Sequence, residues 1–145
     1  MRKYLIVLLL FFVFGVAHNA VAGDYASGVD ASLILKTTTT TGSYPTKYLN
    51  TDKPEITVMK VEIKPGSETG WHSHPVPLYA YVLEGDLTVE AKGGNTYRFT
   101  AGDALVEFVN VPHNGKNLGT IPVVLIVFYT GEIGMPNTVM MPSDQ

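Results

Sequence analysis

The chain contains no cysteine, so disulfide bonds, thiolate metal ligands and thiol nucleophiles are all excluded. It has only four histidines among 145 residues, and it shows no run of lysine and arginine. With a formal net charge of −3 and no basic patch, it is not expected to have a nucleic-acid partner. The fold must therefore be held by a hydrophobic core, and a chain of this length is large enough to form one.

The first 22 residues have the features of a signal peptide. Arg2 and Lys3 give a positively charged start, and an apolar run from Leu5 to Val16 follows. This run is shorter than the roughly 20 residues of a membrane-spanning helix. Ala20-Val21-Ala22 is a small-x-small cleavage pattern, so cleavage before Gly23 is expected. We predict a periplasmic or secreted protein without stable membrane association after cleavage. An uncleaved single-span anchor is the alternative.

Short apolar stretches alternate with clusters of glycine, proline, asparagine and aspartate after the predicted cleavage site. A spacing of about ten residues between such clusters is typical of an all-β sandwich or barrel. Strands are predicted at residues 56–63, 78–83, 87–90, 96–100, 104–109 and 123–130. We expect a core over residues 56–131, between an N-terminal strand and loop at residues 23–55 and a C-terminal tail at residues 132–145.

Three local features carry finer predictions. Residues 32–41 end in five consecutive threonines, and β-branched residues favour a strand, although a low-complexity linker is the alternative. The nearly continuous apolar run from Val123 to Thr130 predicts a strand that is buried on both faces. Asn114-Gly115 is a typical turn pair, so a turn is predicted there.

Three of the four histidines, His72, His74 and His113, indicate a metal site, whereas His18 lies in the predicted signal peptide. In an extended chain, residues i and i+2 point to the same face, so His72 and His74 project together. Pro75 favours this extended conformation in the residue before it. Neutral imidazole is a good ligand for Zn, Cu, Fe and Ni. For the His-x-His pair alone, ordinary hydrogen-bonded polar residues are the alternative.

The order and spacing of these residues resemble the two motifs of the cupin family. The first motif is Gly66-Ser-Glu-Thr-Gly-Trp-His72-Ser-His74, continuing to Gly85, and the second runs from Gly102 through His113 to Asn117. The resemblance covers most of residues 56–130. It implies a cupin jelly roll, or double-stranded β-helix. It also implies a divalent transition metal (Fe, Mn, Ni or Zn) that the motif histidines bind inside the barrel.

The chain departs from the family pattern at one position that bears on this metal. The first motif usually has a glutamate four residues after its second histidine, and here that position is Leu78. Three interpretations stay open: a site of three histidines, a substitute carboxylate from Glu107 or Glu62, or a weak or absent metal in a pocket that binds a small molecule. Loss of the glutamate raises the charge of the site by one unit, which favours an anionic ligand.

Glu107 lies six residues before His113 in the apolar run Ala104-Leu-Val-Glu-Phe-Val. A charged residue in such a run is rarely buried without a partner. It could be the solvent-facing position of an alternating strand. It could instead bind the metal, accept a hydrogen bond from a ligand imidazole, or act as a general acid or base.

Two classes of function follow from the sequence. The first is an exported metal-binding cupin enzyme that acts on a small organic substrate by dioxygenase-like or Lewis-acid chemistry. The alternative is a non-catalytic periplasmic module that binds a small ligand or a metal. An enzyme should leave metal positions open to a pocket, whereas a structural site is closed by four protein ligands. The resemblance also implies a homodimer, with Val123 to Tyr129 as a contact between barrels.

Overall fold

The computed structural model describes residues 27–142, so the predicted signal peptide lies outside the described residues. The chain divides into two compact units, residues 1–33 and 34–145. Of the first unit, the structure describes residues 27–33, which are exposed and form no strand. None of the described residues belongs to a helix with the length and apolar character needed to cross a membrane. The strands and the site described below all belong to the second unit.

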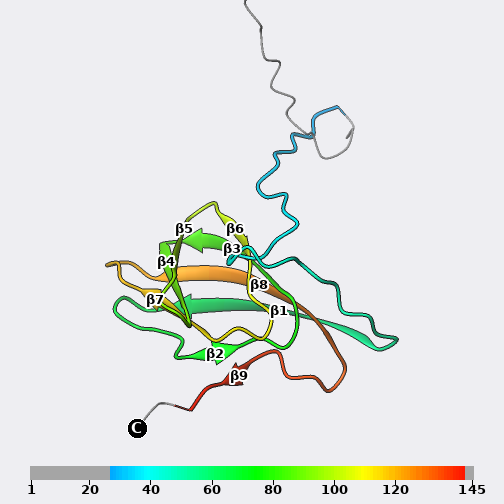
Figure 1. The fold of residues 1–145 in the computed structure, drawn as a ribbon. Coiled ribbons are helices and arrows are strands. Elements are labelled where there is room, and N and C mark those ends of the chain that lie inside the picture. The colour runs from blue at the N-terminus through cyan, green and yellow to red at the C-terminus, as the bar shows by residue number, and fades with distance from the viewer. Residues whose placement is uncertain (1–26, 143–145) are drawn as a thin grey trace, which may run out of the picture. The chain divides into compact units, whose positions relative to one another are not determined.

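Two antiparallel sheets make up the second unit (Figure 1). The first sheet has the order β1-β8-β3-β6 and consists of β1 (Pro54–Ile63), β8 (Val123–Glu132), β3 (Leu78–Glu84) and β6 (Ala104–Val106). The second has the order β5-β4-β7-β2-β9 and consists of β5 (Thr96–Thr100), β4 (Asp86–Ala91), β7 (His113–Asn117), β2 (His72–Ser73) and β9 (Val139–Met140). The predicted all-β class is confirmed.

The core lies between the inner faces of these sheets because side chains alternate along each strand. In β3, Leu78, Ala80 and Val82 are buried, whereas Tyr79 and Tyr81 on the other face are only half-buried. This alternation is the two-residue period of a strand with one face in the core.

Strand β8 is not buried on both faces, contrary to the prediction from its apolar run. Leu125, Val127 and Tyr129 point into the core, but Phe128 between them is 42% exposed. The apolar run therefore reflects one face that fills the core and one outer face that solvent reaches.

The predicted strand within residues 32–41 does not form. Thr39 makes an isolated bridge to Pro45, and the chain between them turns sharply. The amide of Thr40 donates to the carbonyl of Tyr44, and the amide of Ser43 donates to the carbonyl of Thr40. The amide and hydroxyl of Thr41 donate to the carbonyl of Val106 at the end of β6, so this segment contacts the first sheet without forming a strand of it.

The predicted turn at Asn114-Gly115 is also wrong, because β7 runs straight through both residues. The packing is close at this glycine: a Cβ on Gly115 would lie 3.3 Å from Cγ2 of Thr69, which is tighter than an ordinary contact. Asn117, the motif residue at the end of the strand, has a structural role. Its Nδ2 donates to the carbonyls of Ile63 and Ile121, each at 2.8 Å.

Candidate metal centre

The three motif histidines come together at one point of the second sheet. His72 lies on β2 and pairs in register with His113 at the start of β7, and His74 follows directly after β2. Their ring centroids are 4.4 to 5.0 Å apart. Glu107, which follows β6 of the first sheet, joins them, and the four ligand atoms lie within 4.8 Å of one another. Glu62, the other carboxylate considered, is exposed on β1.

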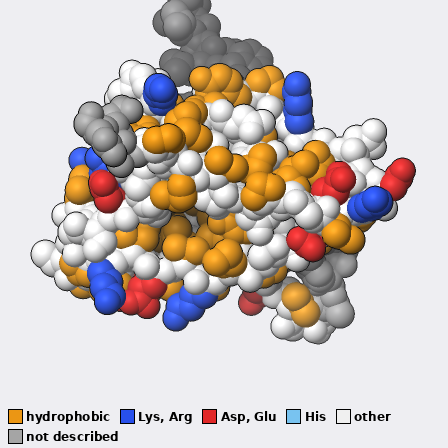
Figure 2. All heavy atoms as spheres, turned by 90° about the horizontal axis from the view of Figure 1, so that it is seen from below, with side chains coloured by type: hydrophobic (Ala, Val, Ile, Leu, Met, Phe, Trp, Pro, Cys, Tyr) orange, Lys and Arg blue, Asp and Glu red, His pale blue; other side chains and the backbone are white. Residues whose placement is uncertain are grey.

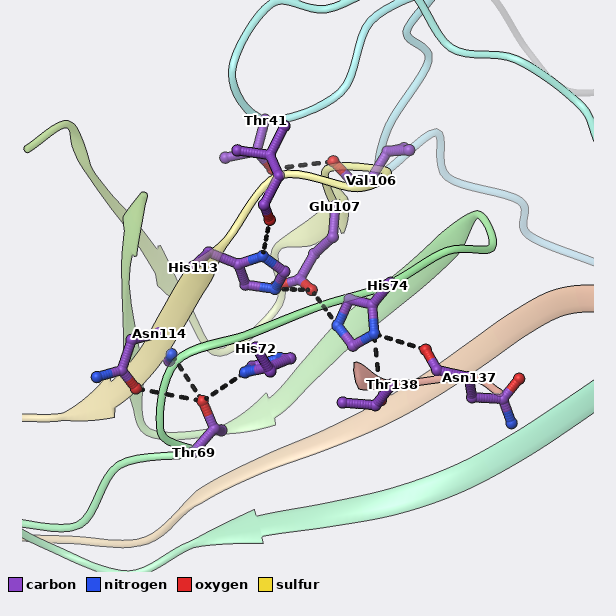
Figure 3. A network of polar contacts seen from close by, with 12 residues as sticks. Thr41, Thr69, His72, His74, Val106, Glu107, His113, Asn114, Asn137 and Thr138 are labelled. Atoms are coloured by element: carbon purple, nitrogen blue, oxygen red, sulfur yellow. Dashed lines mark hydrogen bonds and ion pairs between the residues drawn. The ribbon is translucent and has the colours of Figure 1, made fainter. Parts of the chain in front are cut away.

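Each of the three imidazoles has its Nδ1 atom tied to a backbone carbonyl oxygen. The partners are Gly70 for His72, Asn137 for His74 and Val111 for His113, all at 2.8 Å. A carbonyl oxygen can only accept a hydrogen bond, so Nδ1 must be the protonated nitrogen in each ring. In the neutral ring, Nε2 then carries a free lone pair. Figure 3 shows the three imidazoles around Glu107, with the contact from His74 to Asn137 as one of the dashed lines.

Two threonine hydroxyls support the same arrangement. Oγ1 of Thr69 lies 3.3 Å from Nδ1 of His72 and accepts a hydrogen bond from the amide of Gly115 at 2.9 Å. Oγ1 of Thr138 lies 3.2 Å from Nδ1 of His74. Partners on the outer nitrogen fix the orientation of a metal-binding imidazole. Thr69 lies within the first motif, so its position could have been noticed from the sequence, whereas Thr138 lies in the predicted irregular tail.

Glu107 is buried, with 8% of its surface exposed, so the solvent-facing interpretation of this residue is wrong. Its Oε2 lies 3.0 Å from Nε2 of His113 and 3.1 Å from Nε2 of His74. When both neutral rings are protonated on Nδ1, Oε2 of Glu107 and the two Nε2 atoms are all hydrogen-bond acceptors. They can approach so closely only if a proton or a metal cation lies between them.

The pKa values of the metal-free cluster reflect this arrangement. Burial alone would raise the pKa of Glu107, but hydrogen bonds and charges from His113 and His74 hold it well below its usual range. Burial alone would lower the pKa of His113, but the Glu107 carboxylate and the Val111 carbonyl outweigh it and raise that pKa. Burial lowers the pKa of His72, despite the Gly70 carbonyl, so this ring is neutral at physiological pH.

The donor set fits a divalent transition metal. Three unprotonated imidazole nitrogens and one carboxylate are ligands that Zn, Fe, Mn and Ni accept. Neighbouring ligand atoms bound at about 2.1 Å to one octahedral ion lie about 3 Å apart. The separations of 3.0 and 3.1 Å around Glu107 agree with that value. The substitute carboxylate also removes the extra positive charge that was expected from Leu78.

A cavity of about 180 Å³ adjoins this cluster. His72, His74 and Glu107 reach its surface, together with the hydroxyl residues Thr69, Thr138 and Tyr129. The remaining lining residues are Val61, Ile63, Leu78, Ala80, Leu87, Leu105, Gly115, Leu125, Val127 and Met140. Met140 is 59% exposed, so the cavity reaches the surface beside β9. Figure 2 views the molecule from below and shows a hollow with hydrophobic side chains around it.

Tyr129 belongs to this site although the sequence predicts for it only a buried and dimer-forming strand position. Its ring centroid lies 5.5 Å from that of His74. Burial raises the pKa of Tyr129, and the charge of Glu107 adds to this while Thr138 opposes it. The phenol is therefore neutral at physiological pH. Its alternation with Leu125 and Val127 on β8 is the signal that could have placed it inside the barrel.

The comparisons agree with the motifs. A family model described as "Cupin domain" matches residues 59–129. None of the curated proteins compared with the chain matches it. Together with the two-sheet fold and the motif histidines, the match shows that the chain belongs to the cupin family.

Several solved structures resemble this fold. They include an oxalate decarboxylase from Lactobacillus farciminis in a formate complex, the DMSP lyase DddQ from Ruegeria pomeroyi and a cupin-like protein from Thermotoga maritima. Their TM-scores are 0.53, 0.54 and 0.54, with sequence identities of 24%, 19% and 23%. The matches cover 59%, 62% and 62% of this chain, and 26%, 45% and 67% of the other chains. Similarity at this level of identity shows the fold alone.

Proposed function

We propose that this protein binds one divalent transition metal and uses it as an enzyme on a small organic substrate. The observation that carries the proposal is the convergence of four acceptor atoms, from His72, His74, Glu107 and His113, in one buried site. A bound ion would supply Lewis-acid polarisation of a substrate oxygen or, if it is iron, activation of O2.

The protein's own residues would prepare the site for this chemistry. The three carbonyl partners hold the imidazoles in the tautomer that a metal needs. The cavity beside His72, His74 and Glu107 offers space for a substrate next to the ion. The neutral Tyr129 hydroxyl is available as a hydrogen-bond donor to a bound molecule. An oxalate decarboxylase in complex with formate is among the similar structures, which supports a small organic substrate.

Elemental analysis of the mature chain, residues 23–145, tests metal binding. The protein should be purified without a His tag and under anaerobic conditions, and we expect about one equivalent of metal. The double variant His72→Ala/His113→Ala should lose it. Glu107→Gln should lower the metal affinity at least about tenfold, because an anionic ligand is replaced by an amide. Glu62→Gln is the matched control and should bind like the wild type. Equal metal contents in all four proteins would refute the proposal.

A non-catalytic metal-binding or ligand-binding protein is the second candidate, and one observation favours it. Four protein side chains surround the centre, and closed structural zinc sites also have four. The visible spectrum of the cobalt-substituted protein separates the two cases, because four-coordinate cobalt absorbs far more strongly than six-coordinate cobalt. A weak spectrum that changes when a small anion is added indicates open positions and supports an enzyme. A strong spectrum that no anion changes supports the closed site.

We also propose that the protein is exported and forms a homodimer. The charged start, the apolar run and the Ala20-Val21-Ala22 pattern support export. The cupin family membership and the exposed Phe128 on the outer face of β8 support pairing of two copies through the first sheet. N-terminal sequencing should find Gly23 first, and light scattering should give twice the mass of the mature chain. A chain that still begins at Met1 would overturn the proposed cleavage. The mass of a monomer would overturn the proposed dimer.

A further inference from the structure

The composition of the cavity wall limits what can enter it. Nine of its lining residues have aliphatic or methionine side chains, and they come from both sheets. The polar groups lie at the histidine cluster and at Thr69, Thr138 and Tyr129. None of the lining residues is a lysine or an arginine. Lys116, the neighbour of the lining residue Gly115, is paired outside the cavity with Glu90 at 2.6 Å.

The charge of the centre sets the charge of the ligand. This step rests on the proposed metal. A divalent ion with three neutral imidazoles and the Glu107 carboxylate has a net charge of +1. One anionic head group therefore neutralises the centre. A second carboxylate on the ligand would find no lysine or arginine in the lining to pair with, and burial of an unpaired charge is strongly unfavourable.

The volume sets the size of the ligand. An apolar cavity of about 150 Å³ holds one benzene molecule. A cavity of about 180 Å³ therefore has room for roughly six to eight non-hydrogen atoms. We infer that the substrate is a small monoanionic organic molecule, with one oxygen-bearing head group at the metal and an aliphatic or aromatic body of this size. Ligands with a second charge at the far end are excluded.

Titration calorimetry of the zinc-loaded protein tests this inference with a series of monocarboxylates. Affinity should rise from acetate to pentanoate by about fourfold for each added methylene, which is the factor expected for burial of one such group. It should fall again at octanoate, which exceeds the cavity. Succinate has eight non-hydrogen atoms, which the cavity can hold, and a carboxylate at each end, and it should bind at least about tenfold more weakly than pentanoate. Equal affinity for pentanoate and succinate would overturn the inference.

Two matched variants locate the binding. Ala80 lines the cavity, and Ala80→Leu should weaken pentanoate at least about tenfold while acetate and zinc bind as before. Ala104 pairs with Tyr81 on the outer face of the same sheet, so Ala104→Leu should change nothing in the titration. Equal pentanoate affinity in both variants would show that the apolar chain of pentanoate binds outside this cavity, and it would overturn the inference. Zinc content, measured on the same samples, separates this inference from the proposed function. A protein that binds no zinc refutes both. A zinc-loaded protein whose carboxylate affinity does not depend on chain length refutes only this inference.

Discussion

The carboxylate of Glu107 lies 3.0 Å from Nε2 of His113, although Glu107 follows a strand of the first sheet and His113 lies in the second. Glu107 follows β6, and its amide donates to the carbonyl of Leu78 on β3. Leu78 is the position at which the family's first motif usually has a glutamate. Because the two residues are joined at the backbone, the carboxylate from Glu107 reaches the histidine cluster although the usual glutamate is absent.

The Glu107–His113 pair predicts a specific pH dependence in the metal-free protein. The raised pKa of His113 gives a stabilising contribution that is present below about pH 6.5, the value of an unperturbed imidazole, and is lost as pH rises through the folded pKa. The lowered pKa of Glu107 gives a contribution present above about pH 4.3 and lost as pH falls through its folded value. The pair therefore stabilises the metal-free fold most between these two values.

NMR titration of the His113 ring measures this pair directly. In the metal-free wild type, the His113 pKa should lie above about 6.5. In Glu107→Gln it should fall below that value, because burial then acts without the compensating charge. Glu62→Gln should leave it unchanged. Since a metal must displace the proton, binding near pH 6 should also release about one proton, seen as a dependence of the binding heat on the buffer. A His113 pKa that is the same in both variants would contradict the prediction.

Thr69 is expected to stabilise the fold and the metal site together. The isosteric Thr69→Val removes the acceptor of the Gly115 amide and the hydroxyl beside His72. The free energy of unfolding of the metal-free protein should fall by about 1–3 kcal/mol, because a buried amide loses its partner. Metal affinity should fall by about 10- to 100-fold. Thr138→Val is the comparison: its hydroxyl contacts His74 but accepts no hydrogen bond from a backbone amide of the described residues, so the loss of stability should be smaller. Urea unfolding measures the free energy of unfolding, and metal titration measures the metal affinity.

Two glycines with positive φ allow backbone strain to be separated from steric overlap. Gly94 has a φ of 91° and open space where a Cβ would lie, so Gly94→Ala should cost only about 1–2 kcal/mol. Gly85 has a φ of 77°, and its Cβ would overlap the carbonyl oxygen of Pro122 and lie 3.0 Å from Cα of Val123. Gly85→Ala should therefore be more destabilising by at least about 1–3 kcal/mol. Equal urea midpoints for the two variants would argue against close packing at Gly85.

Much of the fold follows from local sequence patterns. Turn residues separate the strands, and the strand expected at residues 78–83 forms as β3, with Leu78 and Ala80 buried and Tyr79 on the other face. The same two-residue period brings His72 and His74 together. Local patterns fail where a distant part of the chain decides the outcome. The pair Asn114-Gly115 predicts a turn because the local sequence does not show that the distant Thr69 packs against Gly115.

The same limit applies to the site. The sequence names Glu107 as one of two candidate carboxylates, because only the pairing of β6 with β3 brings its carboxylate across to His113 and His74. By sequence alone, the three-histidine interpretation comes before the substitute carboxylate. Asn137 and Thr138 lie outside both motifs. They reach His74 because β9 adds to the edge of β2, a pairing of two residues that is too short for any periodicity to predict.

The C-terminal segment therefore gives a further prediction, which the sequence alone would have placed in an irregular tail. A chain ending at Pro136 lacks the Asn137 carbonyl that holds Nδ1 of His74, and it lacks the Thr138 hydroxyl. It also lacks Met140, which pairs with His72 and covers part of the cavity. Both sheets keep their longer strands, so circular dichroism should remain that of a β protein, while metal affinity should fall by about 10- to 100-fold. A chain that lacks only residues 143–145 is the control and should bind metal like the wild type. If the chain ending at Pro136 bound metal as tightly as this control, the carbonyl of Asn137 would not be needed to orient His74.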